Sequence, residues 1–85
     1  MPPRDPRLCP ALERALPADS GTTSDYRPIG EPWLILFGDG QWHQVQLLAV
    51  WLDRRGRRVV QVEWHAEGDT FGESYLYDAE RMREA

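Results

Sequence analysis

The position of the prolines constrains this chain more than any other feature of its sequence. All seven prolines fall within the first 32 of the 85 residues. Proline has no backbone N–H to donate to a sheet, so a proline-rich segment is a poor candidate for a central strand. We therefore expect residues 1–31 to form a largely irregular, partly disordered arm, and residues 32–85 to form the folded domain.

One short helix is predicted within the arm, at residues 10–16. Pro10 stands at the first helical position, where its missing N–H removes no hydrogen bond, and Pro17 ends the segment. The leucines of this region would share one face that could dock on the domain: Leu8, Leu12 and Leu16. The stretch PADSGTTSDY (17–26) is polar and rich in turn-forming residues, so we expect it to be mobile.

From residue 33 onward, the alternation of residue types predicts β-strands. WLILF (33–37) is a short, wholly apolar strand, and the GDGQ that follows supplies the residues of a hairpin turn. A second strand is expected over residues 41–52. Its alternation places on one face Val45, Leu47, Ala49 and Trp51. The first half of this strand is half polar and the second half is apolar on both faces, which indicates a bend or bulge midway.

Two further strands and a tail complete the predicted elements. RRVVQVEWH (57–65) predicts a third strand with Arg58, Val60, Val62 and Trp64 on one face. After a turn at AEGD, TFGESYLY (70–77) predicts a fourth strand. The tail DAERMRE (78–84) opens with Asp78, a good helix cap, and is predicted to form one or two helical turns.

These elements predict a mainly all-β fold. We expect residues 33–77 to form one antiparallel sheet, with turns near Asp39, Gly56 and Gly68. A meander this small must curl to bury its apolar face, so a strongly bent antiparallel barrel of four to five strands with a short C-terminal helix is predicted. The aromatic residues expected in its core are Trp51, Trp64, Phe71 and either Tyr75 or Tyr77.

The run LDRRGRRVVQVEWHAEGDTFGESY (52–75) resembles the small SH3-like barrels, especially their chromo and Tudor-like branches. Those domains show an apolar strand ending in charged residues and a glycine turn, a strand ending in Trp, an acidic loop, and Thr with an aromatic. The resemblance implies an SH3-like barrel. In the chromo branch, aromatic residues hold a methylated lysine, and one such position falls on Trp64. Another falls on Glu67, which is not aromatic, so we assign Trp64 to the core.

Four arginines surround one glycine in RRGRR: Arg54, Arg55, Arg57 and Arg58. They could bind phosphates, or they could form a hairpin tip whose charges prevent edge pairing. The chain carries a net charge of −4; residues 52–60 carry +3, and residues 61–85 carry −5, from seven acids against two arginines. An acidic flank within about 10 Å would weaken a phosphate site. We therefore favour a tip that is solvated or contacts a protein.

The sequence contains no arrangement typical of catalysis. Cys9 is the single cysteine, which excludes an internal disulfide and a zinc site built from cysteines. The two histidines, His43 and His65, have no metal-ligand spacing, and no serine lies in a nucleophile-elbow context. We expect a protein that is not an enzyme and binds no cofactor and no metal.

The sequence also indicates where the protein is found. Its first ten residues have no apolar run of the kind that a signal peptide needs. The longest apolar run, residues 33–37, is far shorter than the ~20 residues that cross a bilayer. We expect a cytoplasmic protein that does not associate with membranes.

The predicted function is a non-enzymatic protein-interaction module, present as a monomer or weak homodimer. Trp42, beside the GDGQ turn, is the best candidate for an exposed aromatic, a residue type enriched at interfaces. The partner would meet the tip at residues 54–58, the acidic loop or Trp42, while Trp33 could pin the arm to the domain. The alternative is a nucleic-acid-associated accessory protein that binds phosphates through the same tip.

Overall fold

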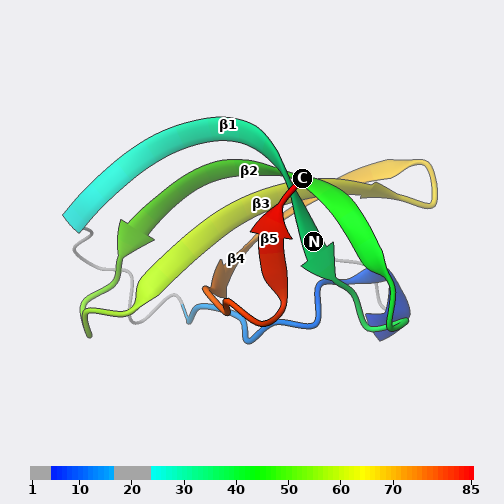
Figure 1. The fold of residues 1–85 in the computed structure, drawn as a ribbon, viewed down its shortest axis with the longest axis horizontal. Coiled ribbons are helices and arrows are strands. Elements are labelled where there is room, and N and C mark those ends of the chain that lie inside the picture. Colours follow the sequence, from blue (N-terminus) through cyan, green and yellow to red (C-terminus); the bar gives the residue numbers. More distant parts are fainter. Residues whose placement is uncertain (1–4, 17–23) are drawn as a thin grey trace.

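The computed structural model describes residues 5–16 and 24–85. Its elements are a 3-10 helix at Pro6–Leu8 and five strands: β1 (Ser24–Leu36), β2 (Trp42–Leu52), β3 (Arg58–Ala66), β4 (Asp69–Leu76) and β5 (Met82–Glu84). The strands form one antiparallel sheet in the order β4-β3-β2-β1-β5 (Figure 1). This confirms the prediction of a mainly β fold. It also confirms a single antiparallel sheet over residues 33–77.

The turns between the long strands lie where the sequence predicts them. Between β3 and β4, Glu67 and Gly68 both have positive φ angles, of 52° and 80°. Positive φ at both central residues is the requirement of a type I′ turn, whose twist matches that of the flanking strands. Between β2 and β3, Gly56 has a φ of 76°, a conformation that glycine adopts without steric cost. Short loops therefore join neighbouring strands throughout the meander.

Strand β1 begins earlier than predicted, because proline does not exclude an edge strand. It starts at Ser24, crosses residue 31, and contains both Pro28 and Pro32. On one side it pairs with β2, with two register shifts in its first half; on the other it pairs with β5 only over residues 33–35. Proline is tolerated where a strand has a neighbour on one side only, and bulges are common at such edges. Proline is excluded from central strands, but β1 is an edge strand outside residues 33–35.

The C-terminal tail forms a turn and a strand, so the prediction of a terminal helix is wrong. Asp78 caps the turn: its side chain accepts a hydrogen bond from the Glu80 amide at 2.9 Å, and its carbonyl accepts one from the Arg81 amide at 3.1 Å. Met82 then pairs with Ile35 of β1 and is 3% exposed. Pairing with the uncovered edge of β1 buries this methionine in the core, which overrides the local signal for a helix.

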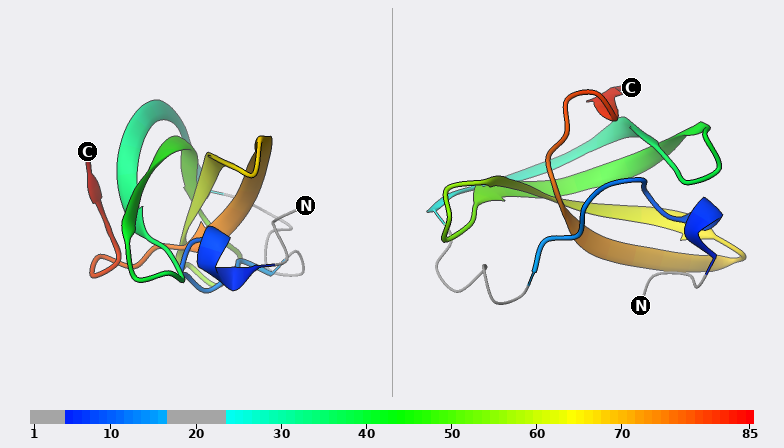
Figure 2. Two further views of the ribbon diagram at one scale, coloured as in Figure 1. Left: turned by 90° about the vertical axis from the view of Figure 1, so that its right-hand side faces the viewer. Right: turned by 90° about the horizontal axis from the view of Figure 1, so that it is seen from below.

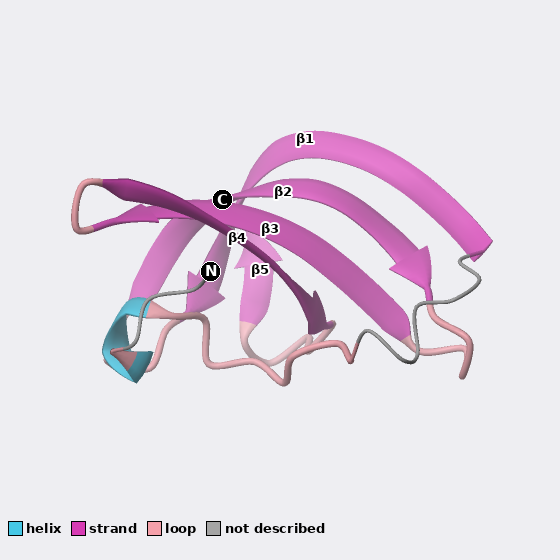
Figure 3. Ribbon diagram, turned by 180° about the vertical axis from the view of Figure 1, so that it is seen from behind, coloured by secondary structure: helices cyan, strands magenta, loops and turns pink. Residues whose placement is uncertain are grey.

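The prediction of a closed barrel is also wrong. β4 and β5 are the two edges of the sheet, and they do not pair with each other. The arm runs between these edges on the concave side (Figure 2, right; Figure 3). Its backbone hydrogen-bonds to the end of β1, through Ala11 N–H to Leu36 O (2.8 Å), and to β4, through Leu76 N–H to Glu13 O (2.8 Å) and Ala15 N–H to Ser74 O (3.0 Å). The arm thus spans the gap between the two edges of the sheet, which in a closed barrel would pair with each other.

These contacts also explain why the helix predicted at residues 10–16 is absent. The Ala15 amide, which would donate within a helix, donates to Ser74 of β4 instead, and the Glu13 carbonyl accepts from the Leu76 amide. Leu12 packs against the core, as the sequence suggested, whereas Leu16 is 58% exposed. Most of the stretch predicted to be mobile, residues 17–23, lies outside the described residues, and its last residues, Asp25 and Tyr26, belong to β1.

The concave face of the sheet, here called the inner face, carries the core. The buried residues that form it are Ile35, Phe37, Val45, Leu47, Val60, Val62, Trp64, Tyr75 and Met82. Trp64 is 2% exposed, which confirms its assignment, and Phe71 stacks on it with ring centroids 5.9 Å apart. Tyr75 is 2% exposed and Tyr77 is 40% exposed, so Tyr75 is the core tyrosine.

The bulge predicted in the second strand is confirmed, and it moves Trp51 out of this core. A register shift between Leu47 and Ala49 reverses the alternation of β2. Leu47 and Val50 therefore face inward, while Trp51 lies on the outer face and stacks on Tyr26 with ring centroids 5.9 Å apart. The prediction that Trp51 belongs to the main core is wrong, because one extra residue in a strand exchanges the faces of all that follow.

Candidate docking groove

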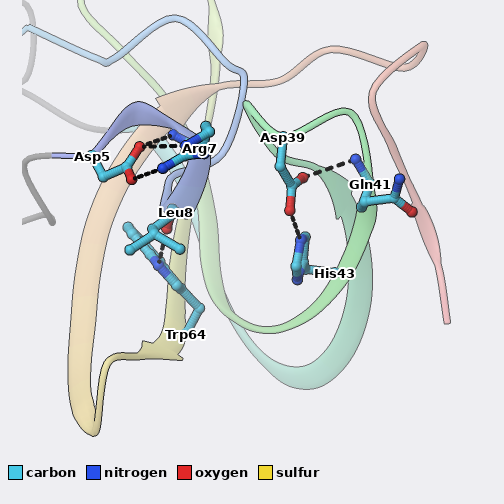
Figure 4. Close-up of polar contacts among 7 residues, drawn as sticks. All are labelled: Asp5, Arg7, Leu8, Asp39, Gln41, His43 and Trp64. Atoms are coloured by element: carbon cyan, nitrogen blue, oxygen red, sulfur yellow. Dashed lines mark hydrogen bonds and ion pairs between the residues drawn. The ribbon is translucent and has the colours of Figure 1, made fainter.

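The arm covers one end of the inner face. The indole N–H of Trp64 donates a hydrogen bond to the Leu8 carbonyl at 3.0 Å (Figure 4). The Gly38 amide, in the β1–β2 turn, donates to the Cys9 carbonyl at 3.0 Å. At this end the polar group of the core tryptophan is satisfied by the arm itself, as a buried indole requires.

The other end of the inner face contains a groove of about 200 Å³. We call it the open groove. It is lined by Ile29, Glu31, Trp33, Leu47, Val50, Arg58, Val60, Tyr77 and Met82. A cavity of about 150 Å³ is enough to hold benzene, so the open groove has room for one aromatic or large aliphatic side chain.

Apolar side chains remain accessible around the open groove. Ile29 is 37% exposed and Tyr77 is 40% exposed. Trp33 is half-buried between them and the core, and its indole N–H donates to a Glu31 carboxylate oxygen at 2.9 Å. Accessible apolar surface gathered around a concavity is typical of interaction sites. From the sequence, Trp33 was predicted only as a contact for the arm, and Ile29 and Tyr77 were not predicted as binding residues.

The arginine-rich segment forms a hairpin tip, as predicted, and Asp53 organises it. Asp53 is 5% exposed. Its carboxylate accepts hydrogen bonds from the Arg55 amide (2.9 Å), the Arg57 amide (2.8 Å) and the Arg57 side chain (3.0 Å). Burial acts to raise the pKa of Asp53, but these hydrogen bonds outweigh it and lower the pKa below its usual value. Sequence reasoning missed this residue, although an aspartate that opens a turn is a known signal.

The four arginines have different surroundings. Arg54 and Arg55 are exposed in the tip, whereas Arg57 binds the buried Asp53. Arg58 is exposed and lines the open groove on the inner face. Arg58 therefore belongs to the open groove, whereas the other three arginines belong to the hairpin tip.

Trp42 lies at the opposite end of β2 from the tip. It is half-buried, and the Arg83 guanidinium lies over its ring, 4.1 Å from the centroid. This is the geometry of a cation–π contact. The predicted binding residues thus lie toward opposite ends of β2, and neither Trp42 nor Arg83 lines the open groove.

Asp39 in the β1–β2 turn and Cys9 in the arm have shifted pKa values. His43 Nε2 lies 2.8 Å from an Asp39 carboxylate oxygen, and the Gln41 amide donates to the other (Figure 4). The Gln41 and His43 hydrogen bonds lower the pKa of Asp39. Burial, followed by the Asp5 charge, raises the pKa of the Cys9 thiol, which opposes formation of a reactive thiolate.

Over residues 5–16 and 24–85, no group of three or more His, Cys, Asp or Glu side chains is placed to hold a metal ion. In the same part of the chain, no helix has the length and apolar character needed to cross a membrane.

No protein-family model matches the sequence, and no match was found among the curated proteins or the solved structures. The structure supports a small antiparallel β fold, and the resemblance to SH3-like barrels stays a prediction. The function must therefore be argued from the surface of this chain.

Proposed function

We propose that this protein is a non-enzymatic interaction module that binds a segment of a partner protein in the open groove. The observation that carries the proposal is the accessible apolar lining, with Ile29 and Tyr77 exposed beside the half-buried Trp33. An apolar surface that the chain leaves accessible gains free energy when a partner covers it. This replaces the arginine tip and Trp42 as the preferred binding surface.

Two features support a peptide segment as the partner. The open groove has room for one large side chain and lacks the volume of a typical small-molecule pocket, which is roughly 300–1,000 Å³. Its lining also includes one arginine and one glutamate, polar groups that can orient an apolar anchor. We also propose that the domain is related to the SH3-like barrels and that the protein is cytoplasmic.

The test is a selection from a random peptide library against the full chain. We expect enriched peptides that bind with micromolar affinity and contain a recurring bulky apolar residue. Ile29→Glu places a charge at the rim of the groove and should abolish their binding. The matched control is Leu16→Glu, which changes a more exposed apolar residue in the arm and should leave binding unchanged. Equal binding by both variants would reject the groove.

The alternative function is phosphate binding through the arginine tip. Arg54 and Arg55 are its exposed residues, and Arg57 contributes less because it binds Asp53. A protein that neutralises about four phosphates should lose duplex-DNA affinity with a log–log salt slope near −3 to −4. Replacing Arg54, Arg55, Arg57 and Arg58 together by glutamine tests it. Salt-sensitive micromolar DNA binding that disappears in this variant would favour the alternative.

A further inference from the structure

We infer that the open groove selects a peptide segment in which a bulky apolar side chain stands next to an acidic residue, with Arg58 and Arg27 receiving the acid. This inference rests on the proposed function and specifies the chemistry of the partner. It is carried by the position of a second hollow, lined by these two arginines, directly beside the apolar groove.

The second hollow, here called the arginine hollow, has a volume of about 100 Å³. Its lining residues are Asp25, Arg27, Val50, Trp51, Leu52 and Arg58. Val50 and Arg58 also line the open groove, so the two concavities share a wall. A side chain in the groove and its neighbour along the same peptide can therefore occupy the two places together.

The strand register brings the two arginines to the same face. Arg27 of β1 lies opposite Val50 of β2, which in turn lies opposite the core residue Val60. Arg58 of β3 lies opposite Leu52, two residues further along β2. Directly paired residues share a face, as do residues two apart, so both arginines are on the inner face. Adjacent strands are about 4.8 Å apart, so two long side chains flanking β2 can reach one carboxylate.

The charges around the hollow favour an acid. Both arginines are exposed, and neither makes an ion pair or side-chain hydrogen bond within residues 5–16 and 24–85. Asp25 is the one acid in the lining of the arginine hollow, which leaves that lining with a charge of +1. Glu31, in the open groove, already accepts the Trp33 indole N–H. The guanidinium fork matches a carboxylate in geometry and charge, which makes an acidic side chain the complementary group.

The experiment uses peptides selected on the full parent protein, as described above. We expect them to carry Asp or Glu beside the bulky apolar residue. One enriched peptide is then synthesised with a blocked C-terminus, together with a version in which its acid is replaced by the corresponding amide. The amide version should bind the parent protein about 10-fold more weakly, the effect of losing one charge-assisted hydrogen bond.

Arg58→Gln separates this inference from the proposed function. The Arg58→Gln variant should bind the acidic peptide more weakly than the parent does, and should bind the acidic and amide peptides equally. The control variant Arg55→Gln should keep the 10-fold preference for the acidic peptide. Peptides that bind through Ile29 but show no acid preference, or a preference that survives Arg58→Gln, would overturn the inference and leave the proposed function standing. Failure to select any peptide would overturn both.

Discussion

The inner and outer faces of the sheet each hold a tryptophan that the sequence assigns to the core, and the two have different surroundings. On the inner face, Trp64 is 2% exposed and donates its N–H to the Leu8 carbonyl. On the outer face, Trp51 stacks on the exposed Tyr26, and its buried N–H has no hydrogen-bond partner among the described residues. The arm contacts Trp64 on the inner face, whereas the ring that stacks on Trp51 is itself exposed.

The difference shows that alternation along a strand does not by itself identify the core face. Both faces of β2 are apolar beyond Leu47. On the inner face, the arm supplies a hydrogen-bond acceptor, the Leu8 carbonyl, and apolar contacts from Cys9 and Leu12. The following four experiments test this contrast, beginning with the largest expected effect.

Removing the inner tryptophan should have the largest effect. Trp64→Ala should destabilise the fold by about 3–5 kcal/mol, the usual result of deleting a fully buried large aromatic side chain. A domain of this size has little stability in reserve, so the variant should be mostly unfolded at 25 °C. Urea unfolding followed by circular dichroism measures this.

The matched control on the outer face is Tyr26→Ala. Tyr26 is 57% exposed, and its substitution should cost about 1 kcal/mol or less. If the two variants lose equal stability, the inner face is not the principal core.

The second experiment detaches the arm without changing the core. A methyl group on Gly38 would collide with the Pro6 carbonyl oxygen and lie 2.9 Å from its carbonyl carbon. Gly38→Ala should therefore displace the 3-10 helix and cost about 1–3 kcal/mol, the range for overpacking. Faster hydrogen exchange of the residue 38 amide, which donates to Cys9, would report the displacement.

Gly72→Ala is the control for a glycine substitution as such. A methyl there meets nothing closer than the Val62 carbonyl oxygen at 3.8 Å, an ordinary contact. We expect no loss of stability and unchanged exchange at Gly38. Equal effects of the two substitutions would show that the arm does not contact the turn.

The third experiment compares the two indole N–H groups directly. Trp64→Phe leaves the part-buried Leu8 carbonyl without its donor, whereas Trp51→Phe removes a buried N–H that has no described partner. An orphaned buried polar group costs roughly 1–3 kcal/mol, and removing an unpaired one is close to neutral. Trp64→Phe should therefore be the more destabilising by roughly that amount. A larger loss for Trp51→Phe would contradict the contrast between the faces.

The smallest expected effect is at the hairpin tip, where the fold depends on a charge. Hydrogen bonds to its carboxylate lower the pKa of Asp53 in the folded state, against the opposing effect of burial. Its contribution to stability is therefore present above the ordinary aspartate pKa near 3.8, and is lost as the pH falls through the lower folded value. At pH 7, Asp53→Asn should have a lower Tm than the parent protein. Below pH 4, the difference in Tm between the two proteins should become smaller. A difference that does not change with pH would show that the charge is not what stabilises the tip.

Much of the fold could be predicted because its signals are local. The three hairpin turns follow from glycines in polar runs, and the inward position of Trp64 follows from alternation with Val60 and Val62. The bulge in β2 was expected from a change in residue pattern, yet its consequence for Trp51 was not, since the pattern does not say which residue is the extra one.

The candidate site was harder to predict because its residues come from distant parts of the chain. Ile29 stands in a segment that the prolines mark as irregular, and Tyr77 was one of two tyrosines competing for the core. Only the curvature of the sheet brings them to one groove with Arg58. Arg58 itself was predicted as a candidate, but as part of a patch with three arginines that the structure separates from it.

The sequence by itself determined the strands and turns between residues 33 and 77 and the residue type of the core, because the alternation of buried and exposed side chains repeats over a few neighbouring residues. Only the tertiary structure decided how the sheet ends. The tail became β5 and the arm crossed between β4 and β5 because the edges of a strongly curved sheet must find hydrogen-bond partners. Two of these pairs, Ala15 with Ser74 and Met82 with Ile35, join residues more than 40 positions apart along the chain. No local pattern encodes a contact over that separation.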